Sequence, residues 1–332
     1  MGDLKDNIKQ LFASSNLQVD TINLGYENTN DIFEVSSDEG CCIVKVPKVT
    51  SDPHNTFWTG LENLFGLTAL DSIKNQIAVS GHLEQYGAIE VPKVFKTDPT
   101  CDNPIGKPYV MLEKMHGEPV PKESELEQEI MQSADYIYQL GVHLGSLHLQ
   151  NQEYFGTLNQ HKYAMEEFPE RLSETISKLG HARKALQDPG VQQMLPRFVD
   201  EALNMKAPNH FALIMPDLWP SQFLAMHDHL SACIDIEACV VGPVALELTL
   251  IELWIGQLGK FKEGYFSVNS HWPEEIEDHR ELYRYFLFLL YGCPDAGLDA
   301  CIHSRAKFPQ RDRVRARISA PRLVPPGYPG LK

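Results

Sequence analysis

The sequence contains no long apolar segment and no pair of cysteines in CxxC spacing. Its most apolar stretch near the end, residues 286–291, is far too short to span a bilayer. The first twelve residues carry acids and no apolar run, which is unlike a secretory signal. The seven cysteines are odd in number and lack zinc-ligand spacing, which disfavours both a disulfide scaffold and a zinc site. We therefore expect a cytoplasmic protein with reduced cysteines and no membrane partner.

Positive charge is also scarce. The formal net charge is −16, which disfavours nucleic acid as the main partner and favours cations, either in the substrate or as a metal. Solubility alone is a plainer explanation of the same charge. The exception is the stretch 303–332, which holds eight Lys or Arg residues against one Asp and ends in a segment rich in Pro and Gly. We expect this stretch to be an extended basic tail outside the core.

The first third of the chain predicts a small lobe built on a sheet. Residues 36–40 form a turn cluster between two strand-like runs, so these runs indicate a hairpin. Helical spacing of apolar residues follows at 57–67 and again at 71–86. The expected strands are 17–23, 31–35, 41–46, 91–95 and 109–112.

After Gly117 the pattern becomes mainly helical. Helical periodicity runs from 123 to about 204 and resumes at 244, while the interval 211–235 has short strand-like runs. The predicted divisions are an N-lobe with the sheet (1–112), a connector (113–117), a helical C-lobe (118–302) and the basic tail (303–332).

Two acidic residues stand at defined places in the strand-like interval. Asp217 precedes an apolar run at 223–226, and Asp235 follows a second run at 232–234. A hairpin between the runs would bring its ends together, so both carboxylates can face one cleft. Phosphoryl transfer needs such a pair, because one carboxylate accepts the proton of the attacking hydroxyl while the other holds Mg²⁺ on the phosphates. Gln222, five residues after the first acid, would supply an amide oxygen to a second metal ion.

The motifs around these acids are similar to those of a known superfamily. The segments MPDLWPSQ (215–222) and IDIEA (234–238) resemble the HGDLHPGN and IDFGD or IDWE patterns of the aminoglycoside phosphotransferase and choline kinase-like superfamily. The DLW tripeptide also looks like the DLWSGN of fructosamine kinases, and segments 242–265 and 280–292 look similar to theirs. The resemblance covers roughly residues 18–292.

This resemblance implies an α+β, two-lobed protein-kinase-like fold, with a small antiparallel-sheet N-lobe and a larger helical C-lobe that bind ATP and Mg²⁺ between them. It makes Asp217 the catalytic base and Gln222 and Asp235 the metal ligands. GYENTNDIFEV (25–35) looks like the nucleotide loop, and YVMLEKMHG (109–117) looks like the strand and connector that hold adenine. The nucleotide-binding residues that it implies are Lys45 on the phosphates, Asn28 and Asn30 in the loop, Gln76 in the helix facing Lys45, and Glu113 in the connector.

Three positions depart from the family pattern. The family's His is Met215 here, its Asn is Gln222, and its helix Glu falls on Gln76, with Glu62 or Glu84 as replacements if the helix is shifted. A neutral glutamine would give the phosphate-binding lysine a hydrogen bond without a charge partner, and charge-assisted bonds are about twice as strong. The expected nucleotide loop is also poor in glycine, which predicts a less close approach to phosphate.

Each of these residues also has a plainer interpretation. Asp217 could be a turn residue, Lys45 an outward-facing strand residue and Gln222 a structural group. Glu237 could be a second acid of the metal site or a solvated loop acid, and we favour the loop acid.

The function that the sequence predicts best is a kinase acting on a hydroxyl of a small molecule. An acid-rich protein would suit a cationic or hydroxylated substrate such as an aminoglycoside, an amino sugar or an amino alcohol. Two alternatives remain open. The departures at Gln76 and Gln222 would mark a catalytically impaired, kinase-like binding protein, and the same fold could also run a different reaction in a reused cleft.

Overall fold

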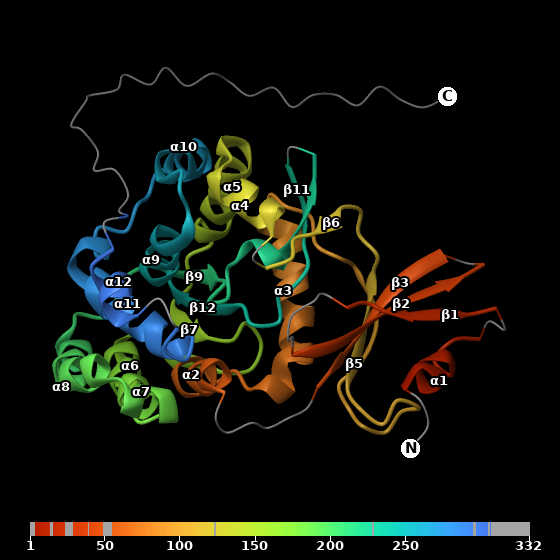
Figure 1. The fold of residues 1–332 in the computed structure, drawn as a ribbon, viewed down its shortest axis with the longest axis horizontal. Coiled ribbons are helices and arrows are strands. Elements are labelled where there is room, and N and C mark those ends of the chain that lie inside the picture. The colour runs from red at the N-terminus through yellow and green to blue at the C-terminus, as the bar shows by residue number, and fades with distance from the viewer. Residues whose placement is uncertain are drawn as a thin grey trace.

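The computed structural model describes residues 4–13, 16–23, 29–38, 40–48, 55–122, 124–227, 229–294, 297–304 and 306. The described part forms two lobes (Figure 1). The smaller is built on a sheet from the first third of the chain, and the larger consists of helices with short strands. The predicted α+β, two-lobed fold is therefore confirmed.

The N-lobe is organised around an antiparallel five-stranded sheet with the strand order β1-β2-β3-β5-β4. The predicted hairpin is confirmed as β2 and β3, in which Ile32 lies opposite Lys45. Because side chains alternate along a strand, Lys45 points to the face opposite Val44, which packs with Ile8 of α1 in a small core. The bounds are α1 (Leu4–Lys9), β1 (Gln18–Thr21), β2 (Asn30–Ser37), β3 (Gly40–Pro47), β4 (Val94–Asp98) and β5 (Tyr109–Glu113).

The strand expected at 91–95 begins later, at Val94. Pro92 lacks a backbone N–H for the ladder, so the residues around it enter the sheet less readily than the apolar pattern suggests.

Two helices separate β3 from β4. α2 (Thr56–Phe65) ends at Gly66, whose φ of 75° gives the left-handed cap that glycine favours. α2 packs against helices of the larger lobe, as Figure 1 shows at its base. α3 (Ser72–Tyr86), reached through the 3₁₀ turn η1 (Ala69–Asp71), lies between the sheet and the larger lobe. A segment that follows an N-lobe strand therefore contributes to the C-lobe core.

The C-lobe combines helices with two small sheets, ordered β11-β10-β6 and β8-β7-β12-β9. The predicted strand-like island is confirmed, with β10 and β11 as its hairpin. The strands are β6 (Glu118–Pro119), β7 (Tyr154–Gly156), β8 (Lys162–Ala164), β9 (Phe211–Ile214), β10 (Phe223–Met226), β11 (His229–Cys233) and β12 (Val240–Pro243). The helices are α4 (Glu125–Gln132), α5 (Ala134–His148), α6 (Phe168–Gly180), α7 (Arg183–Gln187), α8 (Pro189–Asn204), α9 (Val244–Trp254), α10 (Leu258–Val268), α11 (Ile276–Leu290) and α12 (Leu298–Ile302), with 3₁₀ turns η2 (Met165–Glu167) and η3 (Pro220–Gln222).

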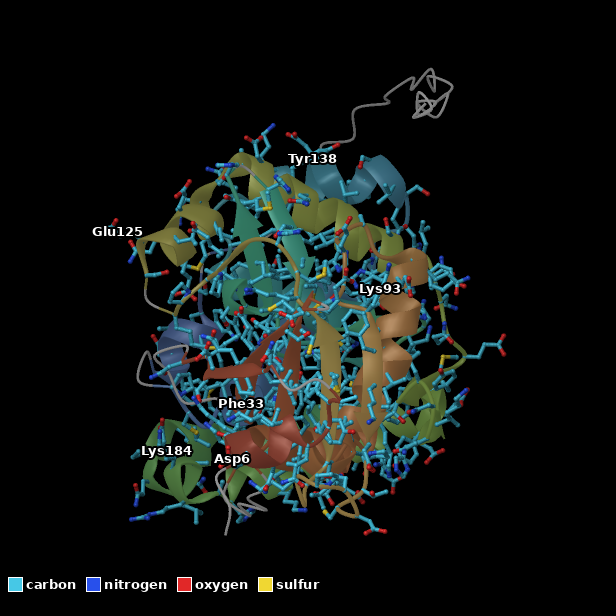
Figure 2. The ribbon with its side chains drawn as sticks, turned by 90° about the vertical axis from the view of Figure 1, so that its right-hand side faces the viewer. Asp6, Phe33, Lys93, Glu125, Tyr138 and Lys184 are labelled. Carbon is cyan, nitrogen blue, oxygen red and sulfur yellow. The ribbon has the colours of Figure 1, made fainter. Side chains whose placement is uncertain are left out.

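Helices α5 and α10 pack closely through glycine. A Cβ atom on Gly141 would lie 2.2 Å from the carbonyl oxygen of Phe261, and one on Gly264 would lie 2.1 Å from that of Tyr138. Seen from the N-lobe side (Figure 2), Phe33 lies on the sheet near α1, while Glu125 and Tyr138 lie at the outer edge of the C-lobe. None of the helices in the described ranges is long and apolar enough to cross a membrane.

Candidate active site

Lys45 on β3 reaches across to the C-lobe segment that follows β11. Lys45 is buried, with only 4% of the residue exposed. Lys45 Nζ lies 2.8 Å from Asp235 Oδ1 and donates a 2.8 Å hydrogen bond to the carbonyl oxygen of Ile234. The residues predicted for the phosphate site and the metal site are therefore in direct contact across the lobe junction.

Glu237 lies in the same segment and is buried. Only 5% of it is exposed, and its Oε2 lies 3.5 Å from Lys45 Nζ. Its Oε1 accepts a 2.6 Å hydrogen bond from Asn30 Nδ2 at the start of β2. The expectation of a solvated loop acid is therefore wrong, because the fold places this segment beneath the N-lobe sheet.

Helix α3 meets this segment through an asparagine. Asn75 Nδ2 donates hydrogen bonds to the carbonyl oxygens of Glu237 and Cys239, at 3.0 and 2.7 Å. The neighbouring Gln76 is buried, but within the described residues no hydrogen bond joins it to Lys45. The structure therefore does not bring the predicted pair of Gln76 and Lys45 together, and Asn75 is a contact that the sequence did not reveal.

Asp217 and Gln222 meet in the loop between β9 and β10. Gln222 Nε2 donates a 2.8 Å hydrogen bond to Asp217 Oδ2. The backbone N–H of Ile234 donates a 2.8 Å hydrogen bond to the carbonyl oxygen of Gln222, which ties this loop to the segment that carries Asp235. The β10–β11 hairpin thus gathers the three predicted catalytic and metal-binding residues at one end.

Asp217 has a perturbed acidity. Burial, followed by the nearby negative charge of Asp235, raises the pKa of Asp217 to about 7. The charge of Lys122 and the hydrogen bond from Gln222 act in the opposite direction. A carboxylate whose pKa lies near neutrality is suited to accept a proton from a hydroxyl.

The cluster around Lys45 contains more acidic groups than basic ones. Burial, together with the charge of Asp235, raises the pKa of Glu237 to about 8. Burial also acts to raise the pKa of Asp235, but the charge and hydrogen bond of Lys45 hold that pKa below its usual value. Burial opposes the charge on Lys45, yet the two carboxylates raise its pKa. Two acids therefore face one buried cation, and a third, Asp217, lies near enough to Asp235 to feel its charge. This is an arrangement that a bound metal ion would balance.

The loop between β9 and η3 is held by buried polar groups of the C-lobe. The backbone N–H of Met215 donates a 2.6 Å hydrogen bond to Glu247 Oε1, and His148 Nε2 lies 2.7 Å from Glu247 Oε2. The hydroxyl of Tyr291 donates to the carbonyl oxygen of Pro216. The loop that carries Asp217 is therefore fixed through backbone groups of Met215 and Pro216.

The other predicted nucleotide-binding residues are less closely placed. Glu113 ends β5 at the connector and is half-buried. Asn28 lies outside the described residues, whereas Asn30 is turned toward Glu237. The exposed Lys122 was not predicted, yet its charge lowers the pKa of both acids, Asp217 and Asp235. A single lysine in a loop gives no sequence signal for such a position.

The residues present fit Mg²⁺. Gln222 Oε1 is a buried oxygen that has no hydrogen-bond partner among the described residues. Mg²⁺ is usually bound through one or two protein oxygens together with substrate phosphates, and Asp235 with Gln222 would supply them. Over the described ranges, no group of three or more His, Cys, Asp and Glu side chains could hold a metal ion by itself.

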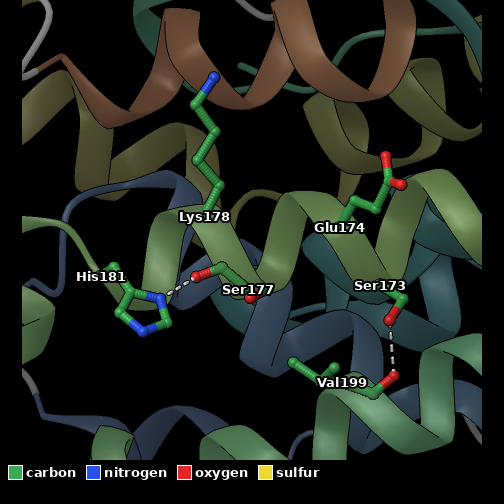
Figure 3. Close-up of a pocket in the computed structure, with 6 residues that line it drawn as sticks. All are labelled: Ser173, Glu174, Ser177, Lys178, His181 and Val199. Atoms are coloured by element: carbon green, nitrogen blue, oxygen red, sulfur yellow. Dashed lines mark hydrogen bonds between the residues drawn. The ribbon is translucent and has the colours of Figure 1, made fainter.

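Two surface hollows lie outside this cluster. One of about 530 Å³ lies between α6 and α8 (Figure 3), where Ser173 Oγ donates a 2.8 Å hydrogen bond to the carbonyl oxygen of Val199 and His181 Nδ1 lies 2.6 Å from the Ser177 carbonyl oxygen. The other, of about 510 Å³, lies around the loop between α10 and α11. Neither is lined by a residue predicted for the site.

Solved structures with this fold include several phosphotransferases. Macrolide 2′-phosphotransferase MphH from Brachybacterium faecium is 13% identical with a TM-score of 0.55, over 93% of this chain and 99% of that chain. The GDP and kanamycin complex of APH(2″)-IIia is 14% identical with a TM-score of 0.56, over 86% and 87%. A fructosamine-3-kinase-like protein from Haemophilus somnus is 12% identical with a TM-score of 0.55, over 86% and 88%. At these identities the likeness shows a shared fold.

The sequence itself matches a family model. No curated protein sequence matches the chain significantly. The model of the phosphotransferase enzyme family, APH, matches residues 21–279, which is most of the chain. The chain therefore belongs to the phosphotransferase enzyme family, as the resemblance of its motifs predicts.

Proposed function

We propose that this protein transfers a phosphoryl group from ATP to a hydroxyl of a small molecule. The observation that carries the proposal is the direct contact of Lys45 with Asp235 across the lobe junction, beside a half-buried Asp217. A lysine and two acids in this arrangement meet the needs of phosphoryl transfer, which is mostly positioning and neutralisation of charge.

Each residue has a proposed part in this reaction. Asp217 accepts the proton of the attacking hydroxyl, and Lys45 contacts the phosphates. Asp235 and Gln222 hold Mg²⁺, which supplies positive charge to the phosphate oxygens when it is bound. Asn28, Asn30 and Glu113 keep their proposed part in binding the nucleotide.

The proposed acceptor is a cationic or hydroxylated molecule such as an aminoglycoside, an amino sugar or an amino alcohol. Two facts support this class. The chain carries a net charge of −16, and a protein with the same fold has been solved in complex with kanamycin and GDP. The turnover screen described below also decides between ATP and GTP as the phosphoryl donor.

A second candidate is a kinase-like protein that binds nucleotide without turnover. Two amides favour this candidate. Gln76 stands where the family has a glutamate, and Gln222 stands where it has an asparagine. Against it, Lys45, Asp217 and Asp235 are all kept, and Gln222 is already bonded to Asp217. Nucleotide binding without product on a broad panel of hydroxyl compounds would favour this candidate.

The test is a turnover screen of the full chain with ATP or GTP and Mg²⁺. Aminoglycosides, macrolides, amino sugars and amino alcohols serve as acceptors, with release of the nucleoside diphosphate and the mass of the product as readouts. Product that disappears in Asp217→Asn, but not in the matched surface variant Asp102→Asn, supports the proposal. Product formation that survives Asp217→Asn unchanged contradicts the assigned base.

A further inference from the structure

The buried lysine of this site takes its charge partners from the C-lobe. In the described part of the chain, the ion pairs of Lys45 are those with Asp235 and Glu237, at 2.8 and 3.5 Å. We propose that Glu237 is the positioning residue for Lys45, in place of the α3 carboxylate that this chain lacks. The inference rests on the proposed function, because positioning matters only if Lys45 serves a nucleotide.

Helix α3 and its neighbours offer no carboxylate for this purpose. Gln76 is neutral, and Glu62 and Glu84 are both exposed and form no ion pair with Lys45 within the described ranges. A shifted helix therefore does not restore the missing pair. Instead α3 supports the partner, since Asn75 donates a hydrogen bond to the carbonyl oxygen of Glu237.

Glu237 is held from both sides as a positioning residue must be. Its Oε1 accepts the hydrogen bond of Asn30 on β2, and its Oε2 faces Lys45 on the neighbouring strand β3. Asn30 and Lys45 lie on the same face of the sheet. Asn30 shares a face with Ile32, which is two residues further along β2, and Ile32 lies opposite Lys45 on β3. The carboxylate thus spans two strands. Asn75 on α3 holds the backbone carbonyl oxygen of the same residue.

Two carboxylates beside Lys45, those of Asp235 and Glu237, can take different roles when nucleotide binds. Asp235 touches Lys45 in the structure, and it is also the proposed metal ligand. When Asp235 serves the metal, Glu237 is the carboxylate that still faces Lys45, at 3.5 Å. Its contact with Lys45 Nζ keeps the lysine aimed at the phosphates.

A double-mutant cycle tests this pairing. The variants are Glu237→Gln, Lys45→Met and the two combined, with affinity for ATP measured by calorimetry with and without Mg²⁺. Glu237→Gln should weaken ATP binding about tenfold in both conditions, since it removes a charge-assisted contact. In the Lys45→Met background the same change should matter no more than about twofold, because its partner is already gone.

Two controls separate this role from others. Glu263→Gln removes a carboxylate from a surface ion pair with Lys260 and should leave ATP affinity unchanged. Glu237→Asp keeps the charge on a shorter side chain and should lose less affinity than Glu237→Gln. A Glu237→Gln effect that is the same in both backgrounds, or that appears only as a higher Mg²⁺ requirement, would overturn the proposal and make Glu237 a metal ligand.

The same four proteins are unfolded thermally without any ligand. Glu237→Gln should lower the melting temperature of the wild type more than that of Lys45→Met, whereas equal shifts would refute the pairing. If wild-type protein binds no nucleotide at all, the proposed function fails, and this ligand-free cycle still decides whether Lys45 and Glu237 are coupled.

Discussion

Two clusters of buried charge in this molecule are built on different principles. In the C-lobe, Arg280 donates to Glu252 at 2.7 and 3.1 Å and to Glu277 at 2.6 and 2.7 Å, and Arg284 donates to Glu252 at 3.1 Å. At the lobe junction, Lys45 has acids around it in excess. The first cluster matches two cations with two acids, whereas the second holds more acidic groups than cations.

The difference separates a structural network from a site. Arg284 also donates to the backbone carbonyl oxygens of Ile302 at the end of α12 and of Ser304 and Ala306 beyond it, so the C-lobe cluster uses these donors to fix the fold. At the junction, Gln222 Oε1 stays without a partner within the described ranges, and the pKa values of Asp217 and Glu237 are raised. Perturbed acids with spare oxygens are typical of functional sites.

The largest expected effect is on catalysis at the junction. Asp217→Asn should lower kcat by about 10³-fold, the usual contribution of a positioned general base. Affinity for ATP with Mg²⁺ should change little, because the proposed role of Asp217 is with the acceptor and not with the nucleotide. Steady-state kinetics on the best acceptor checks this, and a kcat that falls less than tenfold would count against the role.

The next effect concerns the stability of the balanced cluster. Glu252→Ala leaves two buried guanidinium groups without their shared partner, so it should lower the free energy of unfolding by about 3–5 kcal/mol. Glu281→Ala, which removes an exposed pair with Arg197, should cost at most about 1 kcal/mol. Urea unfolding of both variants measures the two losses of unfolding free energy, and equal losses would contradict the prediction.

The burial of Asp217 beside Asp235 predicts a pH dependence of stability. The pKa of Asp217 is raised to about 7 from an ordinary value of 3.8, so the folded state binds this proton more tightly than the unfolded state. The associated stability is present below about pH 4 and is lost as pH rises through about 7. Without ligands, wild-type protein should therefore lose more stability between these values than Asp217→Asn. Thermal unfolding across the range checks it, and parallel curves would speak against the shift.

The smallest expected effect is on metal affinity. Gln222→Leu removes the spare oxygen and should raise the Mg²⁺ concentration for half-maximal activity by about tenfold. Gln222→Asn keeps an amide oxygen and should stay closer to wild type. A magnesium titration of both variants distinguishes a ligand from a structural group, and no change in Gln222→Leu would remove Gln222 from the metal site.

The sequence predicted those parts of the fold that depend on local pattern. The turn cluster between β2 and β3 and the β10–β11 hairpin carry their own signals, and the hairpin brings the segments of Asp217 and Asp235 to one end. The contacts that complete the site could not be predicted in this way. Glu237 meets Asn30 across 207 residues and Asn75 across 162, and a single acid in a short loop looks solvated until the fold covers it.

The sequence also could not predict which lobe α2 packs against, for a similar reason. Its apolar face shows that it must be buried, but periodicity does not tell which lobe buries it. Likewise, neither Glu247 nor Lys122 has a motif of its own. Glu247 accepts a hydrogen bond from the backbone of Met215 in the loop of Asp217, and Lys122 acts on Asp217 through its charge.

The central claim is that the excess of acidic groups at the lobe junction is balanced by the metal ion of a bound nucleotide. Thermal unfolding with ATP, GTP and ADP, each with and without Mg²⁺, tests it most directly, because a bound ligand raises the melting temperature by mass action. We expect a rise that requires Mg²⁺ in wild-type protein and is lost in Asp235→Ala. No rise with any nucleotide, or a rise that Asp235→Ala retains, would contradict the claim.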